Sequence, residues 1–431
     1  MAIIRPFRGF RYNSIDIEDV GQLCSPLFDV ISDSQRQVLY DNPLNSIHLS
    51  LPKHIPSANE TLQNWRKNRI IKQDILPAIY PYYQTFALFG TAKTYVRKGF
   101  VCMISLTDDA TGGIILHENT IENAVNDRIA LLEQTGLNVA PTHGLYEDSN
   151  FELEPLMDEY IAHPVLEAVD YQGVKNQLGV IQNQKDIQKF IELLKTKPVY
   201  MADGHHRLES SVKIRQLWKE KGLLDEAGMG NYHLIYLTNL CSDDIKILPT
   251  HRVIQLPQLF DRQAFLGKMS LYFDFSEFDY RTPLYEEMHN IPHCFGLIFN
   301  DNHYKITLKS TVSLNDVIDL NIPLSAKQLD YTILHYLLLD KGLAMSIDEQ
   351  PKNQHISYVK DYSKAMDIPA NDLSKFAIIV NEVKMDEMLA ICADNAKMPQ
   401  KSTYFYPKVL CGLVFASILA SDNDSPFDSC F

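Results

Sequence analysis

Asp203, Gly204, His205, His206 and Arg207 stand in one run, ADGHHR, at a point where an apolar stretch ends. The planar guanidinium group of an arginine can bond two phosphate oxygens at once, and histidine rings add further hydrogen-bond donors. A glycine lets a ligand approach the backbone closely because it has no side chain. The run therefore predicts a phosphate-binding turn. It is not a Walker loop, because the pattern GxxxxGK[ST] is absent from the chain.

The residues on either side of the run predict the elements that position it. Val199–Ala202 is an apolar stretch of strand length, and from Leu208 onward apolar residues recur at helical spacing until Gly222. We therefore expect a strand, a turn at Asp203–Gly204 and a helix from Arg207 to about Lys221. Such a turn would place the first free N–H groups and the positive end of the helix beside the glycine.

Two other interpretations of the run remain open. Asp203 is a residue type that often begins helices, so the run could make structural hydrogen bonds only. Asp203 and one histidine could instead bind a metal ion, although two adjacent histidines on a helix point in different directions.

Further polar residues stand at the ends of other predicted elements. They are Asp29, the pair His117–Glu118 with Thr120 after it, the pair Asp127–Arg128, and the run Thr250–Arg252. Each group taken alone is more typical of structural hydrogen bonding than of catalysis. Because all of them lie at element ends, we expect a shared polar site that includes Asp29, Glu118, Arg128 and the residues of the turn.

The chain alternates helix-like and strand-like segments, which is typical of an α/β protein with mixed sheets. Hairpins are predicted around Gly90–Lys93 and Asn300–Asn302, and helices in DRIALLEQTG, KDIQKFIELLKTKP and LDYTILHYLLLDKG. The segment SIHLSLP alternates as a strand does. A domain boundary is expected after Gln255, which gives a region 1–255 and a C-terminal α+β region 256–431.

Composition excludes several classes of protein. The chain has 431 residues, a net charge of −14 and no dense run of lysine and arginine, which argues against nucleic-acid binding. No apolar run approaches the length of a membrane-spanning helix, and the first residues do not read as a signal peptide. The seven cysteines are scattered and never in CxxC spacing, so we expect neither a disulfide framework nor a zinc site, and a cytoplasmic protein.

With these residues in view, the chain resembles the domain of unknown function 1015 family. The resemblance rests on segments spread over nearly the whole chain: PFRGFRYN, PLFDVIS, NPLNSIHLSLP, HENT, APTHGLYED, YMADGHHRLESS, ILPTHRVI and MPQKSTYFYPKVLCGLVF. The DGHHR run is in turn similar to the phosphate-binding turn of the ParB/sulfiredoxin-like superfamily, which includes free-serine kinases.

This resemblance implies a ParB/sulfiredoxin-like nucleotide-binding core and phosphoryl transfer from ATP or ADP to a small hydroxyl compound, with free L-serine as the leading acceptor. Mg²⁺ is expected with the nucleotide. The implied phosphate ligands are Gly204, His205, His206 and Arg207, with Arg128 or Arg252 as a second cation. Glu118 is the first choice for the catalytic base and Asp29 the second, Asp203 assists, and His117 and Thr120 contact the substrate. The late segment QKSTYFYPK, with Lys401 and Lys408, either closes over the site or packs aromatic residues.

The chain departs from the family pattern at two places. Leu27 and Phe28 stand where the family usually has proline and tyrosine, and Ala124–Asn126 contain no lysine where the family usually has one before Asp127–Arg128. Two rival functions therefore stay open: a nucleotide-binding regulatory protein without turnover, and a metal-dependent phosphohydrolase. The oligomeric state is not predicted.

Overall fold

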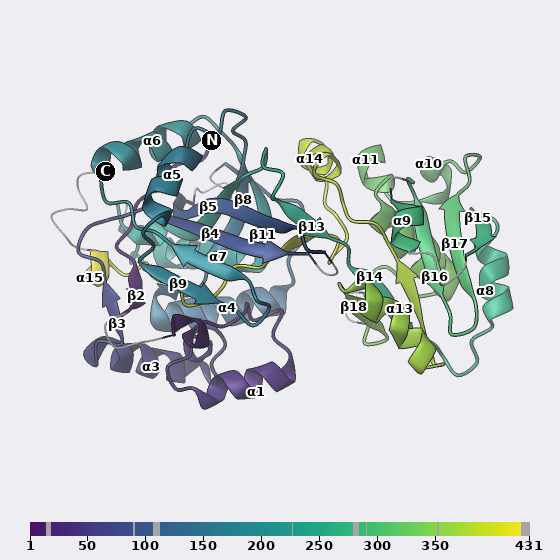
Figure 1. Ribbon diagram of the computed structural model, residues 1–431, viewed down its shortest axis with the longest axis horizontal. Helices are drawn as coiled ribbons and strands as arrows, with labels where there is room; N and C mark the ends of the chain where they lie inside the picture. The colour runs from purple at the N-terminus through teal and green to yellow at the C-terminus, as the bar shows by residue number, and fades with distance from the viewer. Residues whose placement is uncertain are drawn as a thin grey trace. The chain divides into compact units, whose positions relative to one another are not determined.

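The computed structural model describes residues 1–13, 19–88, 91–106, 113–225, 227–278, 284–289, 291–350 and 353–423. The chain forms two compact units (Figure 1), the first made of residues 1–116, 120–246 and 407–431 and the second of residues 117–119 and 247–406. The boundary expected after Gln255 differs from this division, since the last segment returns to the first unit. It returns because Val409, Leu413 and Phe415 are buried in the core of that unit.

A mixed nine-stranded sheet forms the centre of the first unit, in the order β6-β11-β8-β12-β5-β4-β10-β9, with β1 also paired to β5. Its strands are β1 (Ile4–Arg5), β4 (Tyr80–Ala87), β5 (Thr94–Ser105), β6 (Ile114–Ile115), β8 (Thr142–Tyr146), β9 (Leu166–Val169), β10 (Lys175–Leu178), β11 (Val199–Asp203) and β12 (Tyr232–Asn239). β11 runs parallel to β6 and β12 parallel to β8, and the other pairs are antiparallel. Two small sheets pair β2 (Phe10–Tyr12) with β3 (Ile71–Gln73) and β7 (Leu137–Asn138) with β21 (Ala416–Ser417).

Helices cover both faces of this sheet. The helices of the first unit are α1 (Asp33–Asp41), α2 (Ile47–Ser50), α3 (Ile55–Lys67), α4 (Glu122–Thr135), α5 (Glu154–Ile161), α6 (Gln184–Leu194), α7 (His205–Glu220), α15 (Ala420–Asn423) and the short 3-10 turns Val20–Leu23 and Met229–Asn231. On one face, Phe100 and Leu237 pack against Met157 of α5 and Phe190 of α6. The other face carries Tyr82 and Tyr236 and packs against α3, α4 and the returning C-terminal segment.

The second unit contains a six-stranded antiparallel sheet in the order β15-β17-β16-β19-β14-β18. The strands are β14 (His251–Gln255), β15 (Phe273–Glu277), β16 (Cys294–Ile298), β17 (His303–Leu308), β18 (Ile356–Val359) and β19 (Lys375–Ile379). A further pair joins β13 (Lys246–Leu248) to β20 (Tyr404–Tyr406). The helices are α8 (Arg262–Met269), α9 (Leu284–Met288), α10 (Leu314–Val317), α11 (Leu324–Lys327), α12 (Asp330–Ile333), a π-helix (Leu334–Gly342), α13 (Tyr362–Asn371) and α14 (Met385–Ala393).

The structure confirms the mixed α/β fold class and most of the predicted elements. β4 and β5 pair as the expected first hairpin, although Gly90 of its turn lies outside the described residues. The strand expected in SIHLSLP is wrong: Ile47–Ser50 is a helical turn, because the Asn45 side chain accepts a hydrogen bond from the backbone N–H of Ile47 at 2.9 Å and starts it. The expected helix before Gly136 begins earlier than predicted, at Glu122.

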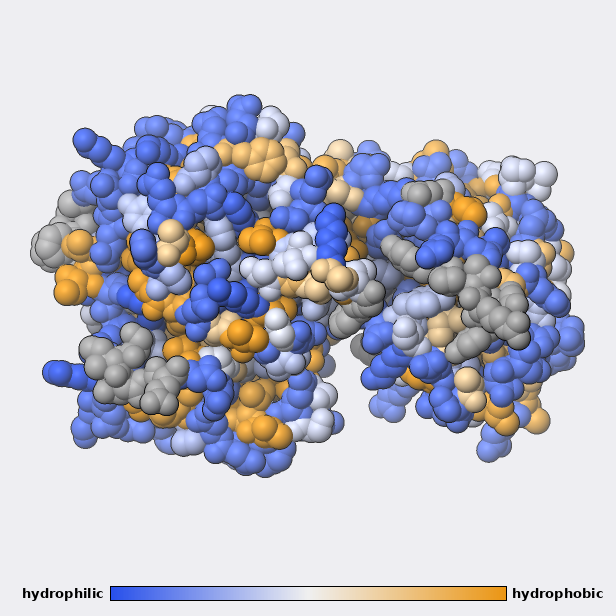
Figure 2. Space-filling view, in the orientation of Figure 1, coloured by the Kyte–Doolittle hydropathy of each residue, from blue (hydrophilic) through white to orange (hydrophobic). Residues whose placement is uncertain are grey.

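In the described part of the chain, no helix is long and apolar enough to cross a membrane. On the face that Figure 2 shows, hydrophilic residues predominate and smaller hydrophobic areas lie between them. The six cysteines in the described ranges form no disulfide.

Candidate functional site

The predicted strand–turn–helix is present in the first unit. β11 ends at Asp203, Gly204 has a φ of +94°, and α7 begins at His205. A left-handed backbone is costly for any residue with a Cβ atom, so the turn requires glycine. A Cβ at this position would also lie 2.7 Å from Cγ2 of Thr142 and 2.8 Å from Nη2 of Arg207. The residue before α7 is a glycine, which has no side chain to cap the helix, and the positive end of the helix dipole lies at this turn.

Asp203 and Arg207 form an ion pair across one turn of α7. Arg207 Nη2 donates to Asp203 Oδ2 at 2.9 Å, and Arg207 Nη1 donates to the backbone oxygen of Pro141 at 2.6 Å. The second oxygen of Asp203 contacts Lys408 Nζ. Burial alone would raise the pKa of Asp203, but the charges of Lys408 and Arg207 outweigh it and hold that pKa well below its ordinary value. The carboxylate is therefore ionised and holds two cations together.

The two histidines of the run face different surroundings. His206 Nε2 accepts a hydrogen bond at 2.9 Å from the backbone N–H of Ile121, the residue just before α4. His205 is buried at the first position of α7. The ring of His206 thus links the starts of two helices, which is a structural contact that the sequence pattern alone could not distinguish from phosphate binding.

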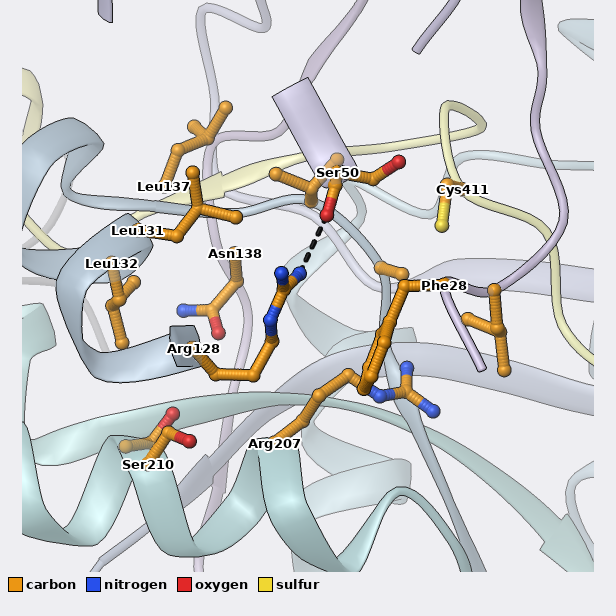
Figure 3. Close-up of a pocket in the computed structure, with 14 residues that line it drawn as sticks. Phe28, Ser50, Arg128, Leu131, Leu132, Leu137, Asn138, Arg207, Ser210 and Cys411 are labelled. Atoms are coloured by element: carbon orange, nitrogen blue, oxygen red, sulfur yellow. Dashed lines mark hydrogen bonds between the residues drawn. The ribbon is translucent and has the colours of Figure 1, made fainter. Parts of the chain in front are cut away.

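Arg128 of α4 and Arg207 of α7 line the same cavity, whose volume is about 60 Å³. Arg128 Nη1 donates to the backbone oxygen of Ser50 at 2.5 Å, and its guanidinium lies 4.4 Å from the centre of the Phe28 ring. Figure 3 draws Arg128, Phe28 and Arg207 around this space, together with Asn138, Ser210 and Cys411. The lining residues include both arginines, several leucines and serines, and no carboxylate. A space of this volume suits a group of phosphate size, because a single water needs roughly 10–15 Å³ on the same measure.

Ser211, which also lines the cavity, was not found by sequence reasoning. Its Oγ lies 2.7 Å from Nδ1 of His233, and Nε2 of His233 lies 3.0 Å from Oγ1 of Thr142. Burial, together with the positive charge of Arg207, lowers the pKa of His233 to about 3, so the ring is neutral near pH 7. The sequence alone could not have predicted that Ser211, His233 and Thr142 lie together, because they belong to three separate elements, α7, β12 and β8.

A larger cavity of about 670 Å³ lies elsewhere in the first unit, within the range of volumes typical of small-molecule sites. Asp19, Asp170, Tyr171 and residues of α1 are among those that line it. Its lining contains no lysine, arginine or histidine, so its charge does not suit a phosphate group.

The remaining predicted residues of the first unit lie at the edge of this arrangement. Thr120 donates a hydrogen bond to the carboxylate of Glu209 on α7. Asp29 is exposed and follows Phe28, which lines the cavity. Asp127 is half exposed and pairs with Arg128.

His117, Glu118 and Arg252 belong to the second unit. Glu118 pairs in a short bridge with Met398, and its Oε1 lies 3.5 Å from the backbone N–H of Lys401. His117 is buried, with Nε2 3.4 Å from Oγ1 of Thr403.

Arg252 differs from its expected role as a phosphate ligand. Its side chain is fully buried in the second unit, between the rings of Tyr331 and Tyr358 at 5.2 and 4.6 Å. It donates to Nε2 of His335 at 3.1 Å and to the backbone oxygens of Thr250 and Lys401. These contacts give Arg252 a structural role in holding the second unit together.

Among the described residues, no group of three or more histidine, cysteine or carboxylate side chains could hold a metal ion. Asp203, the residue for which a metal contact was considered, has both oxygens engaged by cations and does not fit as a metal ligand.

Comparison with known proteins gives a family and several solved structures. The sequence profile of the family described as "Protein of unknown function (DUF1015)" matches residues 4–332. A free serine kinase in complex with AMP is similar with a TM-score of 0.34 and 12% identity, over 68% of this chain and 83% of that one. A conserved hypothetical protein from Pyrococcus furiosus has a TM-score of 0.33 and 12% identity, over 68% of this chain and 87% of that one. SbnI from Staphylococcus aureus, truncated at its C-terminus, has a TM-score of 0.38 and 9% identity, over 75% of this chain and 90% of that one. No curated protein matches the chain.

Proposed function

Because the chain belongs to the DUF1015 family, whose name assigns no activity, we propose a function from its own residues: a nucleotide-dependent phosphotransferase that acts on a small hydroxyl compound. Free L-serine is the first acceptor to test, and ATP or ADP the first donor. The observation that carries the proposal is the pairing of a glycine turn at a helix start with two arginines around a cavity that no carboxylate lines.

Each part of that arrangement suits one requirement of phosphoryl transfer. The start of α7 offers the positive end of the helix dipole to a phosphate. Arg207 and Arg128 offer guanidinium groups that can spread the charge of the transferred group. The cavity beside them is large enough for a phosphate-sized group, and the nucleoside would lie outside it. Positioning and charge stabilisation of this kind supply most of the catalysis in phosphoryl transfer.

The acceptor hydroxyl must lose a proton during transfer, and a carboxylate is the natural base. Glu118, with Asp29 as the second choice, remains our proposal for that role. Mg²⁺ would enter with the nucleotide, bound chiefly by phosphate oxygens and water, as is usual for this ion. Asp203 is not proposed as its ligand, because Lys408 and Arg207 already occupy both carboxylate oxygens.

One alternative has an observation in its favour. Phe28, which stands where the family usually has tyrosine, places an apolar ring against Arg128, so that position offers no hydroxyl group to a substrate. This favours a nucleotide-binding regulatory protein without turnover as the second candidate function. A metal-dependent phosphohydrolase has less support, because the described residues contain no cluster suited to a metal ion.

The test is phosphorus NMR of the purified protein with Mg²⁺, L-serine and ATP or ADP in turn. Phosphoserine formed in proportion to the loss of nucleotide would support the kinase. Nucleotide binding without any consumption, across a panel of small hydroxyl compounds, would favour the regulatory protein. Release of inorganic phosphate from phosphate esters, abolished by a chelator, would favour the hydrolase.

A further inference from the structure

The C-terminal segment Pro407–Cys411 packs on the sheet of the first unit and brings a lysine to the turn. Lys408 Nζ contacts Oδ1 of Asp203, while Arg207 donates to Oδ2 of the same carboxylate at 2.9 Å. The Lys408 side chain is 9% exposed, so it is nearly as buried as a core residue. One carboxylate therefore places an ammonium group and a guanidinium group next to each other at the start of α7.

A row of buried polar side chains sets the position of this segment. Asn176, Gln84 and Arg97 stand directly opposite one another on β10, β4 and β5, and none is exposed to solvent. Arg97 donates to the backbone oxygen of Pro407 and to Oε1 of Gln84. Gln84 Nε2 donates to the backbone oxygen of Lys408 at 3.0 Å and to Oδ1 of Asn176 at 3.1 Å. The row thus holds the backbone of Lys408 and of the residue before it.

Burial of such a row is costly compared with an apolar core. Moving a polar group out of water without a new hydrogen bond raises the free energy of the folded state. Two nitrogens of Arg97, Nε and Nη1, are buried without a hydrogen-bond partner in the described part of the chain. Val101 and Tyr82 show that the same face is otherwise packed with apolar and aromatic side chains. What the polar row adds is a fixed location for two carbonyl groups, and hence for Lys408.

We propose that Lys408 is a further cation of the phosphate site, in addition to Arg207 and Arg128, and that Gln84 and Arg97 are positioning residues that present it. The inference rests on the proposed function, since it concerns the same turn. A lysine is a compact point charge and an arginine a planar fork, so the two can contact different oxygens of a di- or triphosphate. Asp203 keeps both cations in place when no nucleotide is bound.

The first experiment is titration calorimetry of ADP and ATP into wild type, Lys408→Met and Lys408→Arg. We expect Lys408→Met to weaken binding at least tenfold and Lys408→Arg to recover part of that loss. A simpler explanation is that Lys408 only neutralises Asp203, whose free carboxylate would then repel the nucleotide in the variant. The double variant Asp203→Asn/Lys408→Met separates the two explanations. If Lys408 contacts phosphate, the double variant still binds nucleotide weakly. If Lys408 only neutralises Asp203, the double variant binds with wild-type affinity, and that result would overturn the proposal.

The positioning role is tested by a double-mutant cycle between Gln84→Leu and Lys408→Met. Gln84→Leu should weaken nucleotide binding several-fold in wild type and have no effect on affinity in Lys408→Met, because Gln84 acts through the lysine. Equal effects in both backgrounds would overturn the positioning role. If wild type binds no nucleotide, the proposed function fails; if wild type binds and Lys408→Met binds equally well, only this inference fails. Thermal melts followed by tryptophan fluorescence confirm that each variant is folded.

Discussion

Lys408 and Asp203 form an ion pair in the first unit although 205 positions separate them in the chain. Together with Arg207 they make the turn before α7 a charged centre assembled from two distant segments. Both tryptophans of the chain, Trp65 and Trp218, belong to the first unit, so tryptophan fluorescence reports selectively on its unfolding.

The ion pairs of Asp203 predict a dependence of stability on pH. Because its pKa is held below the ordinary value of about 3.9, its contribution is complete above about pH 5 and is lost as the pH falls below about 4. Asp203→Asn should therefore destabilise the first unit by about 2–4 kcal/mol at pH 7, and by progressively less below pH 4. Urea unfolding followed by tryptophan fluorescence at several pH values measures this. Asp243→Asn, at an exposed position, is the control, and a penalty for Asp203→Asn that is constant with pH would contradict the assignment.

Replacement of Gly204 should destabilise the first unit for two reasons, its left-handed backbone and its close approach to Thr142, and these can be tested separately. Gly204→Ala places a Cβ in a left-handed backbone and within 2.7 Å of Thr142, whereas Gly222 has a φ of +65° with open space around it. We expect Gly222→Ala to cost about 1 kcal/mol and Gly204→Ala at least twice as much, with loss of nucleotide binding as well. Fluorescence-detected melts and nucleotide titrations measure both effects. Equal costs for the two variants would mean that the close approach to Thr142 relaxes easily.

Arg252 should stabilise the second unit and leave nucleotide affinity unchanged. Arg252→Ala removes a fully buried guanidinium and its contacts with two tyrosine rings, and we expect a loss of about 3–5 kcal/mol. Scanning calorimetry should show a lower unfolding temperature for the second unit, whose unfolding tryptophan fluorescence does not report because that unit contains no tryptophan. Arg262→Ala, which removes an exposed pair with Asp301, is the control and should cost less than about 1 kcal/mol. Weaker nucleotide binding in folded Arg252→Ala would restore Arg252 as a phosphate ligand.

Glu118→Gln separates binding from chemistry. Glutamine keeps the size of the side chain and can still accept a hydrogen bond, but it cannot take up the acceptor proton. Turnover should fall by roughly 10²–10⁴ while nucleotide affinity stays the same. Phosphoserine formation measured by phosphorus NMR is the readout. Full turnover in this variant would mean that Asp29 is the catalytic base, and Asp29→Asn should then lose turnover.

The sequence predicted the parts of the molecule that depend on local patterns. The change from an apolar run to helical spacing at Gly204 located β11, the turn and α7 to within two residues. The turn of Ile47–Ser50 was mistaken for a strand because two apolar residues separated by one polar residue fit both structures over so short a length.

The cation pair at Asp203 was harder to predict. In the sequence, Lys408 lies in a segment that was noted only for its charged and aromatic residues. Its contact with Asp203 could not be predicted from residue spacing, because it forms only when the C-terminal segment returns to the first unit. His206 and Arg252 were of the right residue type for phosphate binding, but hydrogen bonds to Ile121 and to His335 give them structural contacts. Residue type alone does not separate a ligand from a buried structural donor.

The most direct test of the phosphate site is titration calorimetry of ADP and ATP, with and without Mg²⁺, into wild type, Arg207→Ala and Arg207→Lys. Arg207→Ala removes a charge-assisted contact, so the affinity should fall by about 1.5–3 kcal/mol. Arg207→Lys should recover only part of this, because a point charge cannot reproduce the planar fork. The predicted result is that wild type binds nucleotide most tightly, Arg207→Lys less tightly and Arg207→Ala most weakly. Absence of binding in wild type, or undiminished binding in folded Arg207→Ala, would contradict the phosphate site at the start of α7.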